Sequence, residues 1–135
     1  MLDRYPDLVI LWAGYAFSRD YNQGRGHYNA IRDLRNTLRT DVPQPATCYA
    51  CKSTDVPRVM NNIGAASFYK TPFKEMGGEI ANASGCQDCH DPKTMNLRIT
   101  RPALAEAFER QGKDISKSTH QEMRTLVCAQ CHVEY

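Results

Sequence analysis

The sequence predicts a mainly α-helical, loop-rich fold. Apolar residues recur at helical spacing in several segments, whereas no segment alternates apolar and polar residues strongly enough to predict a sheet. The six cysteines fall into three Cys-x-x-Cys pairs spread over residues 48–131. With 135 residues, 41% of them hydrophobic and 24% charged, the composition is that of a globular chain, and we expect a single unit over residues 1–135.

The first 25 residues are expected to be irregular, because Pro6 and several glycines interrupt them. An apolar stretch over residues 8–14 is too short to span a membrane. Asp3, Arg4 and Asp7 precede it and no small-residue cleavage site follows, so it does not read as a signal peptide.

Residues 28–38 are predicted to form a helix whose apolar face is made of Ala30, Ile31, Leu34 and Leu38. Pro43 and Pro45 should end this helix before the first cysteine pair. Residues 61–85 are rich in Gly and Asn and predict a loop with at most one short helix.

Two helices are predicted in the last third. Residues 101–111 have Thr100 near the cap and Pro102 in the first turn, with an inner face of Ala103, Ala107 and Phe108. A second helix should begin near Ser118, with Gln121 as its capping-box partner, and run into the third cysteine pair.

The cysteine pairs carry the most specific signal. They read Cys48-Tyr49-Ala50-Cys51-Lys52, Cys86-Gln87-Asp88-Cys89-His90 and Cys128-Ala129-Gln130-Cys131-His132. Cys-x-x-Cys-His is typical of c-type haem attachment, in which the cysteines bond the haem and the next residue ligates the iron. Three covalently bound haems would supply the apolar mass around which such a short chain folds.

Other functions of the pairs are less well supported. Structural zinc sites also use Cys-x-x-Cys pairs, but here the gaps are long and the pairs number three. Local disulfides would constrain almost nothing, and a thioredoxin-like motif needs a βαβ context. Lys52 by itself is open to two interpretations, an iron ligand or a solvated neighbour, because a ligating amine must be neutral and therefore buried.

The net charge of the chain and its expected cellular compartment further restrict the functions that it can have. A net charge of +2 and a pI near 8.2 are too mild to predict nucleic-acid binding. Since c-type haem is attached outside the cytoplasm, we expect a periplasmic or otherwise extracytoplasmic bacterial protein, membrane-associated only through a partner. Lacking an export signal, the chain is expected to be mature, processed or part of a longer protein.

The chain resembles the pentahaem cytochrome c nitrite reductases, which reduce nitrite to ammonium. The resemblance rests on residues 8–15, 17–22 and 25–27, on 37–40, on the Lys-terminated motif with Ser53, and on 127–135, in that order along the chain. It implies an enzyme that binds haem c and calcium and that transfers electrons. It also implies nitrite as substrate and a donor cytochrome or quinol-dehydrogenase-type partner.

The resemblance implies a role for each matching residue. Lys52 is similar to the proximal ligand of the active-site haem held by Cys48 and Cys51, and His90 and His132 to the proximal ligands of two bis-His haems that conduct electrons. His27 is similar to the distal ligand of the haem on Cys128 and Cys131. Arg39 and Tyr135 match catalytic residues, and Glu134 with the Tyr135 carbonyl matches part of a calcium site.

Helix geometry agrees with giving His27 and Arg39 to different haems. They bracket the predicted helix and lie twelve residues apart, which is about 18 Å along a helix. From the residues alone, His27 reads as a surface histidine and Arg39 as a helix C-cap. His120 matches no family role and reads as a solvated residue.

The resemblance is partial. The family has five haems, and this chain has motifs for three. The distal-pocket histidine, the remaining calcium ligands, the distal ligand of the second haem and the last two haem motifs have no counterpart here. The chain is thus expected to be the N-terminal part of a nitrite reductase, either truncated or completed by a second chain. The alternative is a trihaem electron-transfer protein, or a subunit of a larger cytochrome assembly, without nitrite reductase activity of its own.

Overall fold

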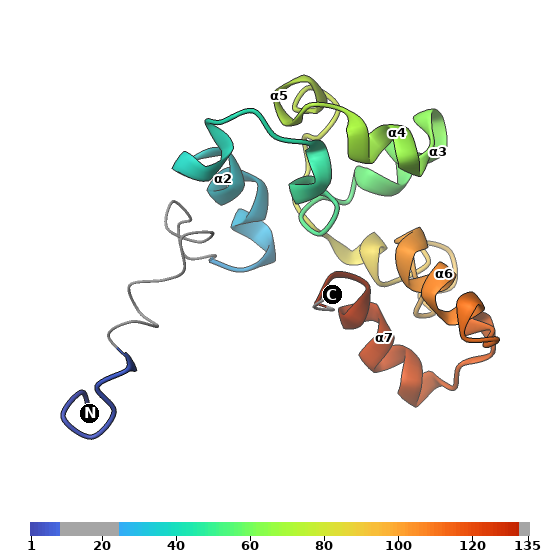
Figure 1. Ribbon diagram of the computed structural model, residues 1–135. Helices are drawn as coiled ribbons and strands as arrows, with labels where there is room; N and C mark the ends of the chain where they lie inside the picture. The colour runs from blue at the N-terminus through green and yellow to red at the C-terminus, as the bar shows by residue number, and fades with distance from the viewer. Residues whose placement is uncertain (9–24, 133–135) are drawn as a thin grey trace.

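The computed structural model describes residues 1–8 and 25–132 as short helices joined by loops (Figure 1). The α-helices are α2 (Ala30–Arg35), α3 (Val56–Ile63), α4 (Ala65–Lys70), α5 (Phe73–Met76), α6 (Pro102–Arg110) and α7 (His120–His132). The 3₁₀ turns are η1 (His27–Asn29), η2 (Leu38–Thr40), η3 (Ala46–Tyr49), η4 (Cys86–Asp88) and η5 (Ile115–Lys117). Isolated bridges replace strands in the described residues, so the predicted mainly α, loop-rich fold class is confirmed.

The helix predicted over residues 28–38 is shorter than expected. The α-helical part ends at Arg35, because the Asn36 side chain bonds the Arg32 carbonyl at 2.8 Å and Thr37 turns extended. Ile31 and Leu34 are buried as predicted, but Leu38 lies beyond the break and is 68% exposed.

The prediction of a loop over residues 61–85 is wrong. This stretch contains the end of α3 and all of α4 and α5. Gly64, at φ 85°, separates α3 from α4, and Pro72 precedes α5. Because each helix has only four to eight residues, its apolar pattern is too short to stand out in the sequence.

The core lies among α2, η3, α3, α4 and α5. Its largest fully buried side chains include Tyr49, Phe68, Ile80 and Val56. Tyr49 stacks on Phe73 with ring centres 4.3 Å apart and planes within 4°, a contact worth about 0.5–1.5 kcal/mol beyond burial. Tyr49 belongs to the first cysteine motif, so the core holds that motif in place.

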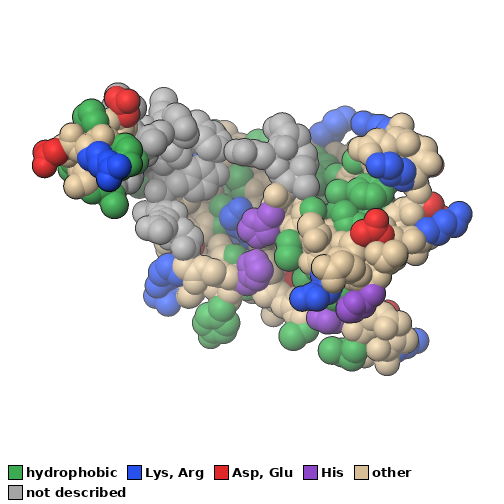
Figure 2. All heavy atoms as spheres, turned by 90° about the horizontal axis from the view of Figure 1, so that it is seen from below, with side chains coloured by type: hydrophobic (Ala, Val, Ile, Leu, Met, Phe, Trp, Pro, Cys, Tyr) green, Lys and Arg blue, Asp and Glu red, His purple; other side chains and the backbone are tan. Residues whose placement is uncertain are grey.

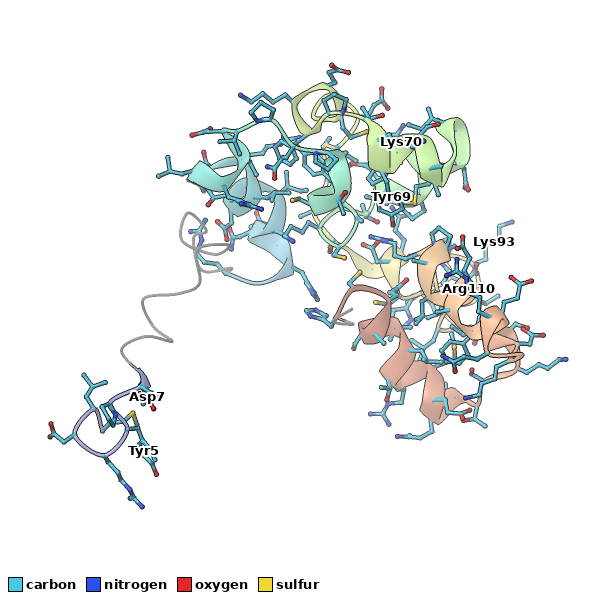
Figure 3. The ribbon with its side chains drawn as sticks, viewed as in Figure 1. Tyr5, Asp7, Tyr69, Lys70, Lys93 and Arg110 are labelled. Carbon is cyan, nitrogen blue, oxygen red and sulfur yellow. The ribbon has the colours of Figure 1, made fainter. Side chains whose placement is uncertain are left out.

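The helices α6 and α7 lie side by side, away from this core (Figure 1). No side chain of α6 is buried, and Ala103 and Ala107, predicted to face inward, are exposed. Helix α7 buries only Val127 and Gln130. Charged residues such as Lys70 at the end of α4 and Arg110 at the end of α6 stand on the outside (Figure 3). The helices α6 and α7 therefore contribute few buried apolar side chains to a core.

The capping box of α7 lies one residue later than predicted. Thr119 and Glu122 form the capping box: the Thr119 amide donates to Glu122 at 2.7 Å, and the Glu122 amide to the Thr119 hydroxyl at 3.3 Å. The predicted pair was Ser118 and Gln121. As predicted, the helix continues through the third cysteine motif.

Candidate haem-binding site

The first motif follows η3 and carries Lys52. The Lys52 amide donates to the Tyr49 carbonyl at 2.9 Å, and the Ser84 amide donates to the Lys52 carbonyl at 3.1 Å, so the backbone of Lys52 is held on both sides. Its side chain is half-buried and makes no hydrogen bond or ion pair with residues 1–8 or 25–132. The backbone at Lys52 is thus fixed, and the described residues leave its amine unbonded.

Arg39 lies close to the first motif along a chain of hydrogen bonds. The Gln44 amide donates to the Arg39 carbonyl at 3.2 Å, and the Cys48 thiol lies 3.9 Å from the other amide atom of Gln44, its Oε1. Arg39 is half-buried at the centre of η2. Gln44 thereby links the Arg39 backbone to Cys48 of the first motif.

The second motif forms η4 and ends in a well-oriented histidine. The Nδ1–H of His90 donates to the Met95 carbonyl at 2.8 Å, with the tautomer assigned from that contact. This leaves Nε2 with its lone pair free. Histidines that bind metals are commonly oriented by a carbonyl in this way, and no sequence pattern predicts this partner.

A tight turn holds the Met95 carbonyl in place. Asp91 accepts from the Thr94 amide at 2.9 Å and the Lys93 amide at 3.0 Å, and these bonds lower the pKa of Asp91. The Met95 amide bonds back to the Asp91 carbonyl at 2.8 Å, and Met95 has a φ of 61°. Such a conformation is uncommon for methionine, and it keeps the carbonyl directed at His90.

The third motif lies in α7 and brings His132 close to His27. Their ring centres are 6.2 Å apart, with planes tilted by 42°. An imidazole nitrogen lies about 2 Å from a bound metal, so rings whose centres are 6.2 Å apart leave room for one metal ion between them. The pair therefore fits one iron between the rings. Histidine side chains are also visible at the surface seen from below (Figure 2).

The segment before His27 is held by an ion pair. The Arg25 guanidinium contacts the Asp33 carboxylate on α2 at 2.6 Å. This contact lowers the pKa of Asp33 and raises that of Arg25. The pair anchors Gly26 and His27 at the start of η1.

The three motifs converge, with the third between the other two. The thiols of Cys51 and Cys131 interact, and this interaction lowers the pKa of Cys51 to about 6 and raises that of Cys131. On the other side, the Cys89 thiol lies 4.0 Å from the Val127 carbonyl. Burial raises the pKa of Cys89. The second cysteines of all three motifs are half-buried, whereas Cys86 and Cys128 are exposed.

The donor set fits covalent haem better than the alternatives. All six cysteines are free, so no disulfide framework is formed. Among residues 1–8 and 25–132, no three His, Cys, Asp or Glu side chains are grouped to hold a metal ion, so the zinc alternative finds no ligand set there. Each pair instead presents two thiols and a following nitrogen ligand, the combination that c-type haem requires.

Some predicted features lie outside the described residues. These are the apolar stretch after Leu8, Glu134 and Tyr135, so the predicted calcium ligands and catalytic tyrosine stay predictions. His120, at the start of α7, is exposed and lines a cavity of about 440 Å³ with Leu97 and Met123. Within the described part of the chain, no helix has the length and hydrophobicity needed to cross a membrane.

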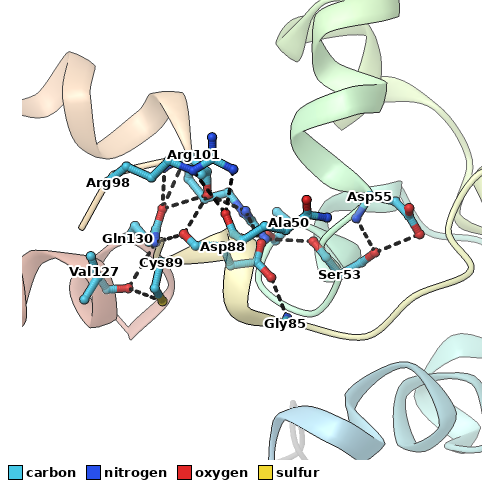
Figure 4. Close-up of polar contacts among 12 residues, drawn as sticks. Ala50, Ser53, Asp55, Gly85, Asp88, Cys89, Arg98, Arg101, Val127 and Gln130 are labelled. Atoms are coloured by element: carbon cyan, nitrogen blue, oxygen red, sulfur yellow. Dashed lines mark hydrogen bonds and ion pairs between the residues drawn. The ribbon is translucent and has the colours of Figure 1, made fainter. Parts of the chain in front are cut away.

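A buried arginine that sequence reasoning missed joins the motifs. Arg101, expected only as the start of a helix, is 3% exposed and lies in a polar network with Asp88 and Gln130 (Figure 4). The only sequence signal is an arginine next to the helix-starting Pro102, which does not reveal contacts with residues 13 to 51 positions away.

The chain is similar to known proteins along its whole length. It is 61% identical to the cytochrome c-552 of Parabacteroides distasonis and 59% identical to that of Porphyromonas gingivalis, in each case over 100% of this chain and 29% of the relative. It spans less than a third of the length of these curated relatives.

A solved structure and a family model agree with these relatives. The catalytic subunit (NrfA) of the cytochrome c nitrite reductase from Desulfovibrio desulfuricans, described with two calcium sites, superposes with a TM-score of 0.81 at 38% identity, covering 95% of this chain and 29% of that one. The fold is thus similar to that of a cytochrome c nitrite reductase. The model of the cytochrome c552 family matches residues 1–135, and the chain belongs to the cytochrome c552 family.

Proposed function

We propose that this chain binds three haem c groups covalently and forms the three-haem portion of an ammonia-forming nitrite reductase. One observation carries the proposal: a Lys-terminated Cys-x-x-Cys motif lies beside two His-terminated ones, in a fold similar to that of a nitrite reductase catalytic subunit. A motif with a different ligand indicates a haem with a different task from its neighbours.

Each haem has a complete or partial ligand set in the chain. Cys48 and Cys51 would hold the first, with Lys52 as the proximal ligand. Cys86 and Cys89 would hold the second, with His90. Cys128 and Cys131 would hold the third, between His132 and His27, whose 6.2 Å separation supports this assignment.

The residues around Lys52 suit the reduction of an oxyanion. Haem supplies iron that exchanges one electron at a time, and conversion of nitrite to ammonium takes six electrons and eight protons. Lys52 would give its lone pair on one side, for which its amine must lose a proton. Arg39 stays charged and would hold the nitrite oxygens and the negative charge that develops on them. Tyr135 is proposed to donate protons.

The order of the motifs supports internal electron transfer. Cys51 of the first motif contacts Cys131 of the third, and Cys89 of the second contacts Val127 beside the third. Electrons that enter at the second or third motif would thus reach the first through neighbours. His27 and His132 together would fill both ligand positions of the third haem, and a haem filled in this way would suit electron conduction.

The proposal includes partners and a location. The chain is proposed to act in the bacterial periplasm, to receive electrons from a donor cytochrome or a quinol-dehydrogenase-type partner, and to work with a C-terminal remainder on the same or a second chain. Glu134 and the Tyr135 carbonyl are proposed to bind part of a calcium site, in line with the calcium sites of the similar nitrite reductase.

The test combines mass and turnover. The intact mass of the denatured protein should show one haem for each cysteine pair carried by the polypeptide. The reduced holoprotein should convert nitrite to ammonium and consume six electrons for each ammonium released. A protein that carries haem but releases no ammonium would favour the alternative function, that of an electron-transfer protein. Absence of haem would contradict the proposal entirely.

Replacing His27 by alanine should open one face of the third haem. Loss of the ring 6.2 Å from His132 removes the proposed distal ligand, so ferric iron there should change from low spin to high spin. Electron paramagnetic resonance (EPR) spectroscopy of the holoprotein would show the change. Tyr28→Ala is the matched control, because Tyr28 is adjacent and 90% exposed. An unchanged low-spin signal in His27→Ala would exclude His27 as the ligand.

A further inference from the structure

We propose that Arg101 is a positioning residue that fixes the three Cys-x-x-Cys motifs relative to one another. In each motif it bonds to the residue directly before the second cysteine, namely Ala50, Asp88 and Gln130 (Figure 4). The inference rests on the proposed function, because it assigns to Arg101 control over how the bound haems lie against one another.

The contact with the first motif uses two arms of the guanidinium. Nε donates to the Ala50 carbonyl and Nη2 to the Ser53 carbonyl, each at 2.8 Å. These carbonyls flank Cys51 and Lys52. A planar guanidinium can reach both at once, whereas the single ammonium of a lysine cannot match this fork. Ser53 is itself fully buried and donates to the Asn82 carbonyl at 2.6 Å.

The contact with the second motif is a buried ion pair. Nη1 of Arg101 lies 2.6 Å from Oδ1 of Asp88, and the side chains are 3% and 9% exposed. The other carboxylate oxygen of Asp88 accepts from the Gly85 amide at 2.8 Å, which closes the turn that begins the motif. Removing either charge would leave the other buried without its partner, so the pair resists local rearrangement.

The contact with the third motif passes through Gln130. Its Oε1 accepts from the Arg101 amide at 3.2 Å and the Thr100 amide at 2.8 Å. Its Nε2 donates to the Asp88 carbonyl at 2.9 Å. Gln130 thus ties the third motif to Arg101 and to the second motif, and its buried amide has partners for both its oxygen and its nitrogen.

The charge of Arg101 also acts on each motif. Arg101 is 3% exposed, and its guanidinium lies 2.8 Å from the Ala50 carbonyl and 2.6 Å from the Asp88 carboxylate, each directly before a second cysteine. A buried positive charge near all three attachment points would favour the reduced state of each iron. Substitution of Arg101 should therefore change both the geometry and the reduction of the haems.

The experiment compares Arg101→Gln, Arg101→Lys and Arg98→Gln in the holoprotein. Arg98 is the matched control: it bonds the Gln87 carbonyl at 2.8 Å, lies 3.9 Å from the Asp91 carboxylate and bonds neither the first nor the third motif, with a side chain 37% exposed. Intact mass gives the haem count, and a potentiometric titration followed by EPR spectroscopy gives the order of reduction and the magnetic coupling between neighbouring haems.

We expect all three variants to keep the wild-type haem count, because attachment depends on the cysteines. Arg101→Gln should shift the titration and change the coupled EPR signals, Arg101→Lys should keep the charge beside Asp88 and change them less, and Arg98→Gln should match the wild type.

Two results would overturn the inference. One is an Arg101→Gln protein with unchanged signals and titration, including one whose only defect is a lower melting temperature. The other applies where Arg101→Gln yields no holoprotein: Arg101→Lys then decides, and wild-type signals in that variant would reject the role. A wild-type protein without haem would instead reject the proposed function, so the two failures are distinguishable.

Discussion

Replacing Lys52 by leucine is expected to abolish reduction of nitrite to ammonium while Cys48 and Cys51 still hold haem. Leucine is apolar, shorter by two atoms and has no lone pair, so the first haem would lose the proposed proximal ligand and the electron donation that this ligand supplies. We expect the turnover rate to fall by about 10³-fold or more, the scale of removing an essential group. Ammonium release from the reduced holoprotein, with the haem count from intact mass, measures this.

The control for this substitution is Lys70→Leu, which makes the same change on the exposed end of α4. It should retain full turnover. Lys52→His offers a second comparison, because it converts the first motif into the form of the other two; its EPR spectrum should then show a His-ligated haem. Full turnover in Lys52→Leu would show that Lys52 is a bystander, the second interpretation that the sequence left open.

Local signals in the sequence were enough to predict α6 and α7. Pro102 at the start of α6 and the polar residues before α7 act within one helical turn, so a single stretch of sequence contains the whole signal. The cysteine pairs are equally local, because two cysteines and the following ligand need no distant partner to be recognised.

The helices α3, α4 and α5 could not be predicted in this way. Each is too short to be stable by itself, and they form because Val56, Phe68 and Phe73 pack together with Tyr49 in one core. The break at Asn36 is a similar case, since one side-chain bond to Arg32 outweighs the apolar periodicity that continues to Leu38.

The contacts that join the three motifs could not be predicted from the sequence either. The Met95 carbonyl that orients His90 depends on an unusual φ, and the closeness of Cys51 to Cys131 depends on how α7 packs. Arg101 is the clearest example. Its partners come from three separate motifs, and only the folded chain brings two of them to its guanidinium and the third to its backbone amide.

Replacing Arg39 by alanine should slow the reduction of nitrite by about 10²- to 10³-fold in kcat, as found when one preorganised donor to a developing oxyanion is removed. The structure gives this expectation a physical basis, because Gln44 links the Arg39 backbone to Cys48 and so holds the arginine near the first motif. Initial rates of nitrite consumption at saturating nitrite, under excess reductant, measure kcat.

Two further variants separate charge and geometry from general damage. Arg39→Lys keeps the charge but loses the planar fork, so it should recover part of the lost rate. Arg32→Ala removes an exposed arginine from the neighbouring helix α2 and should leave kcat unchanged. If Arg39→Ala keeps a rate within about twofold of wild type, a gap far smaller than an oxyanion donor produces, Arg39 does not face the substrate. It would then act only as the C-terminal cap that the sequence alone suggested.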